Sequence, residues 1–297
     1  MNFFNTSASF EQKIELPLFA QKQVEVWMKR DDLLHPFVSG NKYRKLKYLA
    51  QDALQQGKQH LVTFGGAYSN HLVATASAGA ALGLKTTAIL RGEEAFNNPM
   101  QSICRLYGME FQQVSREEYR NKDAAFAKHF GNNDDVYRID EGGYSALGAQ
   151  GCADIHAELT QTYSHIFCAV GTGTTVAGLI NGASEGTQVH GVVVLKGAEY
   201  LKTEIDNLLT TPKDFTLHHN FYFGGYGKFD AEIMHFIKEF AGATGVLLDP
   251  VYTAKMMMGL QQLIQQDYFS KNSKILVIHT GGLWGLTSEK AIELSAR

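Results

Sequence analysis

The chain is organised around residues 39–46, which read Ser39-Gly40-Asn41-Lys42-Tyr43-Arg44-Lys45-Leu46. The turn-forming Ser-Gly-Asn precedes a predicted helix whose apolar residues recur at helical spacing. Lys42 then falls in the first turn of this helix and Lys45 one turn later, where free backbone N–H groups favour an anion. A lysine fixed at such a place indicates a chemical role. The alternative is a solvated, Lys/Arg-rich helix face, which is the commoner origin of a charge run.

The composition is that of a compact globular protein, with 297 residues, 44% of them hydrophobic, and only 5 prolines. This length is enough for one large or two medium domains. A net charge of −3 provides no basic surface, so we expect no nucleic-acid partner. No apolar run is long enough to span a membrane, and the scattered histidines indicate no metal site. Cys104, Cys152 and Cys168 lack CxxC spacing, which favours reduced thiols and a cytoplasmic location.

Predicted strands and helices alternate along the chain. Buried runs such as His60 to Phe64, Ile166 to Val170 and Lys274 to His279 read as strands, and helical stretches of about 10 to 15 residues separate such runs. This alternation predicts an α/β fold with parallel sheets and right-handed crossovers.

Several of these strands end in loops rich in glycine or hydroxyl groups, which is where ligands bind in open α/β sheets. The strongest such loop is Gly171-Thr172-Gly173-Thr174-Thr175. Its glycines allow the backbone to approach an anion, its threonines add donors, and the following helix contributes its positive end. The loop therefore predicts a site for a single phosphate group, although an ordinary strand-to-helix turn would have a similar sequence.

Two familiar phosphate motifs do not fit this loop. A dinucleotide-binding fingerprint needs a third glycine, where this chain has Val176, and an acidic residue after the next strand, where it has Lys196. A P-loop needs a lysine after its glycines, and none follows them here. A small cofactor with one phosphate fits better. Pyridoxal phosphate would also use a lysine that is largely neutral near pH 7, a state that burial or a neighbouring cation can produce. We therefore predict Lys42 as a Schiff-base lysine and Lys45 as a phosphate contact.

Five motifs, in this order and spacing, carry a family resemblance. They are Lys29-Arg30-Asp31-Asp32-Leu33, Ser39-Gly40-Asn41-Lys42, Ser69-Asn70-His71, Asp249-Pro250-Val251-Tyr252-Thr253 and His279-Thr280-Gly281-Gly282. Over nearly its whole length the chain resembles the fold-type II, tryptophan-synthase-β-like enzymes, and within them the 1-aminocyclopropane-1-carboxylate (ACC) deaminases and D-cysteine desulfhydrases.

The resemblance implies two domains with open, twisted parallel sheets flanked by helices. Residues 1–45 and 151–297 would form a large cofactor-binding domain and residues 46–150 a small one, with the active site in the cleft between them. It also implies pyridoxal 5'-phosphate as cofactor, a small amino-acid substrate and a homodimer.

The resemblance assigns roles to individual residues. Lys42 would carry the cofactor and transfer protons, Asn70 would contact the phenolic oxygen, and Ser69 and His71 would lie near the substrate carboxylate. Tyr226 and Tyr252 would line the substrate side. The remaining cofactor contacts would be Lys45, Gly171, Thr172, Gly173, Thr174, Thr175, Thr253 at the pyridine nitrogen, and Thr280. By itself, Ser69-Asn70 could equally be a helix cap, and either tyrosine could simply pack.

Three positions distinguish the chain within this family. ACC deaminases carry a glutamate at the position of Thr253 and a glutamine at the position of His71. In both positions this chain resembles the desulfhydrases instead. An arginine that is common in both groups is replaced by Val73 in this chain. We therefore predict β-elimination from a small D-amino acid such as D-cysteine, which releases pyruvate, ammonia and sulfide. One alternative is ACC deamination, which gives 2-oxobutyrate and ammonia. The other is a non-catalytic relative that binds a phosphate ligand, and the presence of Lys42 argues against it.

Overall fold

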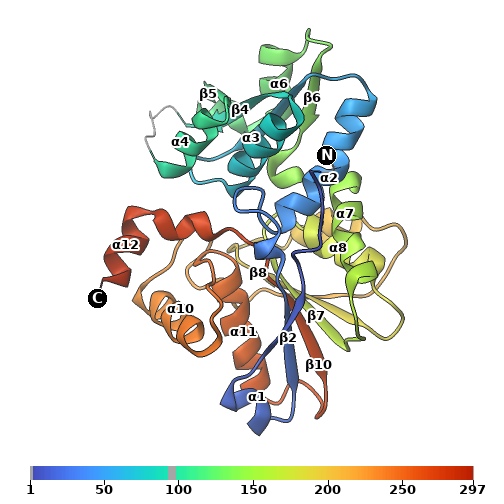
Figure 1. Cartoon of the computed structure of the whole chain (residues 1–297), viewed down its shortest axis with the longest axis vertical. Helices are drawn as coiled ribbons and strands as arrows, with labels where there is room; N and C mark the ends of the chain where they lie inside the picture. Colours follow the sequence, from blue (N-terminus) through green and yellow to red (C-terminus); the bar gives the residue numbers. More distant parts are fainter. Residues whose placement is uncertain (1–2, 93–97, 297) are drawn as a thin grey trace.

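A computed structural model describes residues 3–92 and 98–296, and it contains two β-sheets that lie in separate halves of the molecule (Figure 1). The six-stranded sheet has the order β1 (Glu11–Ile14), β2 (Glu25–Lys29), β10 (Lys274–Ile278), β7 (His165–Val170), β8 (Gln188–Val193) and β9 (Thr216–His218). The four-stranded sheet has the order β5 (Glu110–Val114), β4 (Lys85–Arg91), β3 (His60–Gly65) and β6 (Val136–Ile139).

The neighbouring strands pair in parallel except at one edge, where β1 runs antiparallel to β2. The predicted α/β class with parallel sheets flanked by helices is therefore confirmed. Sequence analysis did not predict β1, which has four residues and a single buried side chain. An edge strand of this kind lacks the continuous apolar run that marks a strand buried on both faces.

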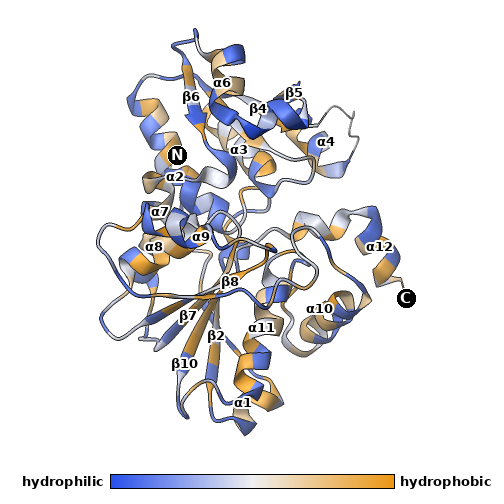
Figure 2. Ribbon diagram, turned by 180° about the vertical axis from the view of Figure 1, so that it is seen from behind, coloured by the Kyte–Doolittle hydropathy of each residue, from blue (hydrophilic) through white to orange (hydrophobic). Residues whose placement is uncertain are grey.

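Helices cover both faces of the six-stranded sheet, because alternate strand residues point to opposite sides. Phe167 packs with residues of α1 (Pro17–Gln21), α10 (Ala231–Thr244) and α11 (Thr253–Gln265). Its neighbours Ile166 and Cys168 pack on the other face with α7 (Ala146–Ala153), η3 (Asp154–Glu158), α8 (Thr174–Gly182) and α9 (Leu201–Asp206). Figure 2 shows β2 and β10 mostly in the hydrophobic colour, as strands buried on both faces require.

The four-stranded sheet is covered in the same way. One face packs against α2 (Asn41–Gln55), α3 (Asn70–Leu82) and α4 (Pro99–Leu106). The other face packs against α5 (Arg116–Arg120) and α6 (Lys122–Phe130). The chain breaks between these two helices at Asn121, whose side chain accepts a hydrogen bond from the Ala124 N–H and begins α6. The remaining elements are η1 (Asp31–Leu33), η2 (Glu141–Gly143), η4 (Leu283–Thr287) and α12 (Glu289–Ser295).

The proposed domain limits, after residues 45 and 150, fall inside α2 and α7. These helices pack closely, since a side chain at Gly151 would lie 2.0 Å from the Arg44 carbonyl oxygen. The junction between the halves is thus a helix pair and not an open linker, and the limits themselves stay a prediction. Within residues 3–92 and 98–296, no helix has the length and apolar character to cross a membrane.

Three histidines form a row across the edge of the six-stranded sheet. His165 Nδ1 lies 3.0 Å from His190 Nε2, and His190 Nδ1 lies 3.2 Å from His218 Nε2. Burial lowers the pKa of His190 to about 3 and that of His218 to about 4. The folded chain therefore favours the neutral forms of His190 and His218.

Candidate active site

A cleft of about 1030 Å³ lies between the two sheets, lined by loops that follow strands of both. Most of the residues singled out in the sequence line it: Lys42, Lys45, Ser69, Asn70, His71, Gly171, Thr172, Gly173, Thr175, Tyr226, Tyr252 and Thr280. Thr174, Thr253 and Val73 are fully buried and do not belong to the lining.

The start of α2 is packed directly on the loop after β10. Gly40 precedes the helix with φ of +60°, and a side chain there would lie 2.0 Å from the Thr280 carbonyl oxygen. Only glycine fits this contact and conformation. The next residue, Asn41, accepts a hydrogen bond from Lys42 Nζ (2.9 Å) and donates one to Thr175 Oγ1 (2.9 Å). Asn41 therefore joins Lys42 to the glycine-threonine loop, a role that only its adjacency to Lys42 could have suggested.

Lys42 lines the cleft, and the residue as a whole is half-buried. Its amine group, however, is shielded from solvent. This desolvation, reinforced by the nearby Lys45 ammonium, lowers the pKa of Lys42 to about 7. Lys45 is 2% exposed, its Nζ donates to the Gly142 carbonyl oxygen at 3.1 Å, and burial lowers its pKa as well. About half of the Lys42 amines are thus neutral near pH 7, and the neutral amine is the form that condenses with an aldehyde.

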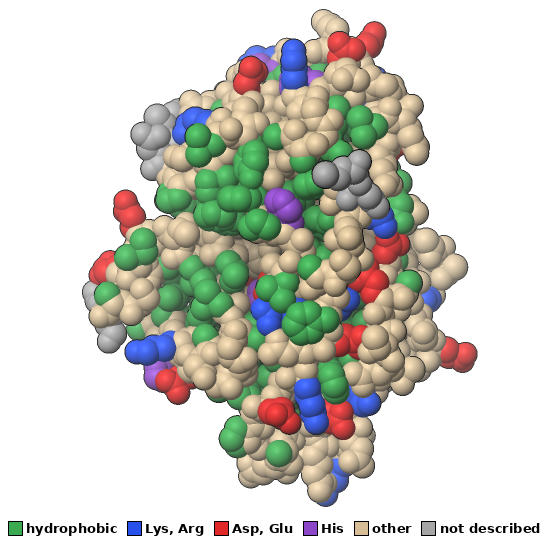
Figure 3. All heavy atoms as spheres, viewed as in Figure 1, with side chains coloured by type: hydrophobic (Ala, Val, Ile, Leu, Met, Phe, Trp, Pro, Cys, Tyr) green, Lys and Arg blue, Asp and Glu red, His purple; other side chains and the backbone are tan. Residues whose placement is uncertain are grey.

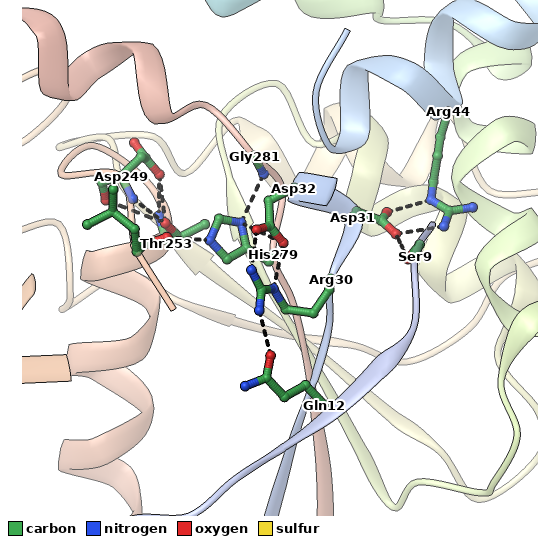
Figure 4. Close-up of polar contacts among 11 residues, drawn as sticks. Ser9, Gln12, Arg30, Asp31, Asp32, Arg44, Asp249, Thr253, His279 and Gly281 are labelled. Atoms are coloured by element: carbon green, nitrogen blue, oxygen red, sulfur yellow. Dashed lines mark hydrogen bonds and ion pairs between the residues drawn. The ribbon is translucent and has the colours of Figure 1, made fainter. Parts of the chain in front are cut away.

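A buried ion-pair network fixes the helix that carries both lysines (Figure 4). Arg44 Nη2 donates to Asp31 Oδ1 at 2.7 Å and to Glu158 Oε2 at 2.9 Å. Asp31 belongs to η1 and Glu158 to η3, so the guanidinium ties α2 to two other elements of the large half. A bidentate arginine in this position restricts the rotation of the helix and hence the direction of Lys42.

The loop between β7 and α8 forms a concave helix start. Gly173 precedes α8 with φ of +85°, and a side chain there would lie 2.7 Å from Ile205. The first backbone N–H groups of α8 are free of helical partners, as at any helix start, and favour an anion. Thr175 borders the cleft, whereas Thr174 is buried with its hydroxyl 3.2 Å from that of Thr172.

Ser69 occupies the N-cap position of α3 but does not act as a cap. Among the residues that the structure describes, its side chain accepts no hydrogen bond from the first turn of the helix. The hydroxyl is thus available to the cleft. The neighbouring Asn70 amide lies against the loop after β10, because a side chain at Gly282 would be 3.1 Å from Asn70 Nδ2. Asn70 Oδ1 is buried and has no hydrogen-bond partner in the described structure.

His71 is held in one tautomer. Thr63 Oγ1 donates its only hydrogen to the Ile139 carbonyl oxygen (2.8 Å), so it must accept from His71 Nε2–H (2.8 Å). His71 Nδ1 is then an unprotonated acceptor, and it is buried without a partner in the described part of the chain. Burial and the charges of Lys42 and Lys45 keep the pKa of His71 well below its usual value. In this form His71 Nδ1 can accept a hydrogen bond but cannot donate one, and the Nε2 hydrogen is already bonded to Thr63.

Thr253 is fully buried and does not belong to the cleft lining, and its hydroxyl hydrogen is bonded to Asp249 (Figure 4). Thr253 Oγ1 donates to Asp249 Oδ1 (2.9 Å) and accepts from the Asp249 N–H (2.8 Å). The buried Asp249 carboxylate also accepts from the backbone N–H groups of Val251, Tyr252 and Thr253. The contact of Thr253 with a cofactor nitrogen therefore stays a prediction: in the folded chain Thr253 is the first residue of α11, and its hydroxyl is bonded to Asp249.

Tyr226 and Tyr252 meet at the cleft. Their rings lie 6.0 Å apart at 68°, in an edge-to-face arrangement. Tyr252 also lies over the glycine-threonine loop, since a side chain at Gly171 would be 3.2 Å from its ring. Burial and the neighbouring Tyr226 raise the pKa of Tyr252 well above its usual value, so it remains a phenol and can donate a hydrogen bond.

The chemistry of this cleft fits pyridoxal phosphate. It combines a desolvated lysine amine, the buried Lys45 amine at the cleft, and polar atoms on Asn70 and His71 that lack partners in the described structure. The fold and the cleft together define an α/β enzyme with a ligand site between two parallel sheets.

The chain belongs to the pyridoxal-phosphate dependent enzyme family, whose model matches residues 12–281. It is therefore a pyridoxal-phosphate dependent enzyme. A relative from Thermotoga maritima, named provisionally as an ACC deaminase, is 36% identical over 286 residues, which cover 89% of this chain and 90% of that protein. A D-cysteine desulfhydrase from Yersinia enterocolitica is 33% identical over 293 residues, which cover 87% and 86%. The crystal structure of an ACC deaminase homologue superposes with a TM-score of 0.85 at 30% identity, over 96% of this chain and 93% of that one.

Proposed function

We propose that the enzyme is a lyase that acts on a small D-amino acid, with β-elimination from D-cysteine as its main reaction. Water and D-cysteine would give pyruvate, ammonia and hydrogen sulfide. The observation that carries the proposal is Lys42, an amine in the cleft whose pKa is lowered to about 7. Such an amine can hold a carbonyl cofactor and can also accept a proton from a substrate carbon.

Bound pyridoxal phosphate supplies an aldehyde for the lysine and an electron-withdrawing ring next to the bond that breaks. In the proposed division of work, Lys42 takes the α-proton of the substrate. Lys45 and the start of α8 hold the phosphate, and Asn70 and Thr280 orient the ring. Ser69 holds the substrate carboxylate, while Tyr226 and Tyr252 close the substrate side. Glycines 171 and 173, with Thr172 and Thr175, shape the phosphate site.

Position 253 favours D-cysteine over ACC. Opening the ACC ring, which has no α-hydrogen, demands strong electron withdrawal, and ACC deaminases carry a glutamate at this position. Thr253 is neutral, and its hydroxyl is bonded to Asp249. Elimination of sulfide needs less stabilisation of the carbanion because the β-bond breaks soon after the proton leaves. A relative named D-cysteine desulfhydrase is consistent with this choice.

ACC deamination is the second candidate, because another relative and the superposed crystal structure carry that name. Purified enzyme should be incubated separately with D-cysteine, L-cysteine, β-chloro-D-alanine and ACC, and the 2-oxo acids assayed. We expect pyruvate from D-cysteine and β-chloro-D-alanine and little 2-oxobutyrate from ACC. Formation of 2-oxobutyrate from ACC with D-cysteine inert would favour the second candidate.

Lys42→Ala is the matching test of the lysine. The variant should bind pyridoxal phosphate without a covalent link and show no turnover, and borohydride reduction of the wild type should place the phosphopyridoxyl group on Lys42. A label on another lysine, or an active variant, would contradict the assignment.

We further propose a cytoplasmic homodimer. The buried, free thiols of Cys104, Cys152 and Cys168 are consistent with a reducing compartment. Figure 3 shows hydrophobic side chains gathered near the junction of the two halves. A gathering of exposed apolar side chains is consistent with a protein contact. Sedimentation equilibrium of the purified chain would test the dimer.

A further inference from the structure

The loop that carries Tyr226 consists of two successive turns. The Gly225 N–H donates to the Tyr222 carbonyl oxygen (2.9 Å), and the Lys228 N–H donates to the Gly225 carbonyl oxygen (3.2 Å). Tyr226 lies at the centre of the second turn and is 50% exposed at the edge of the cleft. In an isolated chain two such turns would be only marginally stable.

One of the residues inside the first turn has an unfavourable backbone conformation. Phe223 has φ of +42°, which is rare for a bulky side chain, and Gly224 follows with +84°. A conformation of this kind persists only where surrounding contacts determine it. The loop therefore needs an external support.

Lys255, in the first turn of α11, provides that support. Its side chain is fully buried, and Nζ donates to the carbonyl oxygens of Tyr222 (2.9 Å) and Gly225 (2.7 Å). These are the two carbonyls at which the two turns begin. One helical turn later, Gly259 lets the chain approach the helix, because a side chain there would lie 2.8 Å from the Phe221 ring.

The same helix turn also fixes the second tyrosine. Tyr252 is the residue that precedes α11, and its ring meets that of Tyr226 at 6.0 Å. Burial lowers the pKa of Lys255 to about 8, while the carboxylates of Asp249 and Asp230 favour its charged form. A buried cation is costly unless its hydrogens are bonded, so the two carbonyls and the ammonium stabilise one another.

We propose that Lys255 is a positioning residue, which holds the double turn of residues 222–228 and thereby places Tyr226 against Tyr252 at the substrate side of the cleft. The effect of Lys255 on the loop is independent of the reaction, whereas its effect on turnover rests on the proposed role of Tyr226.

Hydrogen exchange of the holoenzyme, followed by mass spectrometry, tests the first part. In Lys255→Met the amides of residues 223–228 should exchange at least 10-fold faster, while those of residues 256–264 keep their protection. Lys213→Met is the control, since Lys213 Nζ also donates to backbone carbonyl oxygens, but to those of Ile180 in α8 and of Ala183 just after it, and to none of residues 222–228. Unchanged exchange at residues 223–228 in Lys255→Met would overturn the proposal.

If Lys255→Met does not fold, Lys255→Gln replaces it, because the amide retains N–H donors without the charge. The 223–228 amides should then exchange faster than in the wild type by a smaller factor. Equal exchange in Lys255→Gln and the wild type would show that the ammonium does not hold the loop.

A double-mutant cycle with D-cysteine tests the second part. Lys255→Met and Tyr226→Phe should each lower kcat/KM at least 10-fold, and the double variant should be no worse than the poorer single variant. Independent, multiplying losses would show that Lys255 does not act through Tyr226. If the wild type is inactive on every substrate of the panel, the proposed function fails, while the exchange result still decides whether Lys255 holds the loop.

Discussion

The repulsion between the two lysines of α2 predicts a measurable change in amine reactivity. With a pKa of about 7, roughly half of the Lys42 amines are neutral at pH 7, against about 1 in 3,000 for a free lysine. Burial is the larger cause and Lys45 the second. Lys45→Met removes a like charge, so the cationic form of Lys42 becomes easier to form and its pKa rises.

The size of this rise follows from Coulomb's law. Residues one turn apart on a helix have side chains about 5 to 6 Å apart, and two charges at about 6 Å with an effective dielectric constant of about 20 repel by about 3 kcal/mol. That repulsion corresponds to about 2 pKa units as an upper bound, and water in the cleft reduces it to about 1. The pKa of Lys42 should therefore move to about 8 or 9, and its neutral fraction at pH 7 should fall to between about one tenth and about one hundredth.

The assay is covalent labelling of the apoenzyme by pyridoxal, which has no phosphate and so avoids the proposed phosphate contact of Lys45. The adduct is trapped with borohydride and mapped to Lys42, and its initial rate is measured from pH 6 to 10. At pH 7 the variant should react about 5 to 50 times more slowly than the wild type, with the difference vanishing above about pH 9.5. Lys47→Met is the control, because Lys47 is paired with Asp154 at 2.6 Å outside the cleft. An unchanged or lower apparent pKa in Lys45→Met would refute the reasoning.

Three further predictions concern binding and stability. Thr175→Ala removes a hydroxyl at the cleft and should weaken pyridoxal-phosphate binding by about 1.5–3 kcal/mol, whereas Thr174→Ala, outside the cleft lining, should weaken it less. Equal affinities of both variants and the wild type in a fluorescence titration would contradict this prediction. The folded-state pKa values of His190 and His218 are lowered, so their contribution to the free energy of unfolding is complete above pH 6.5 and is lost as the pH falls toward 4. In urea titrations over this pH range, the free energy of unfolding of His190→Phe should therefore fall less steeply than that of the wild type, by about 1.4 kcal/mol per pH unit. Thr253→Val deletes the hydroxyl that donates to Asp249 Oδ1 and accepts from the Asp249 N–H, and it should lower the free energy of unfolding by about 2 kcal/mol and the melting temperature by about 4 °C; an unchanged melting curve would show that this hydroxyl is dispensable.

The sequence by itself determined the fold class, and most of the residues that it singled out line the cleft. Strands buried on both faces leave continuous apolar runs, and helices leave apolar residues at helical spacing, so both can be recognised without neighbours. The loop Gly171 to Thr175 follows β7, and most of it lines the cleft. Short or half-exposed elements such as β1 and α12 escaped recognition because their residues carry little of this periodicity.

Only the tertiary structure decided which groups meet and which hydrogen bonds each side chain makes. Asn41 and Thr175 are 134 residues apart in sequence, yet they share a hydrogen bond that links Lys42 to the glycine-threonine loop. Thr253 has a hydroxyl that could have served a ligand, but the nearer Asp249 carboxylate takes it. Lys255 reads in the sequence as an ordinary helix lysine, although it is buried under the Tyr226 loop. The physical reason is that periodicity records burial, whereas the partner of a polar atom depends on the order of strands and the approach of loops far away in the chain.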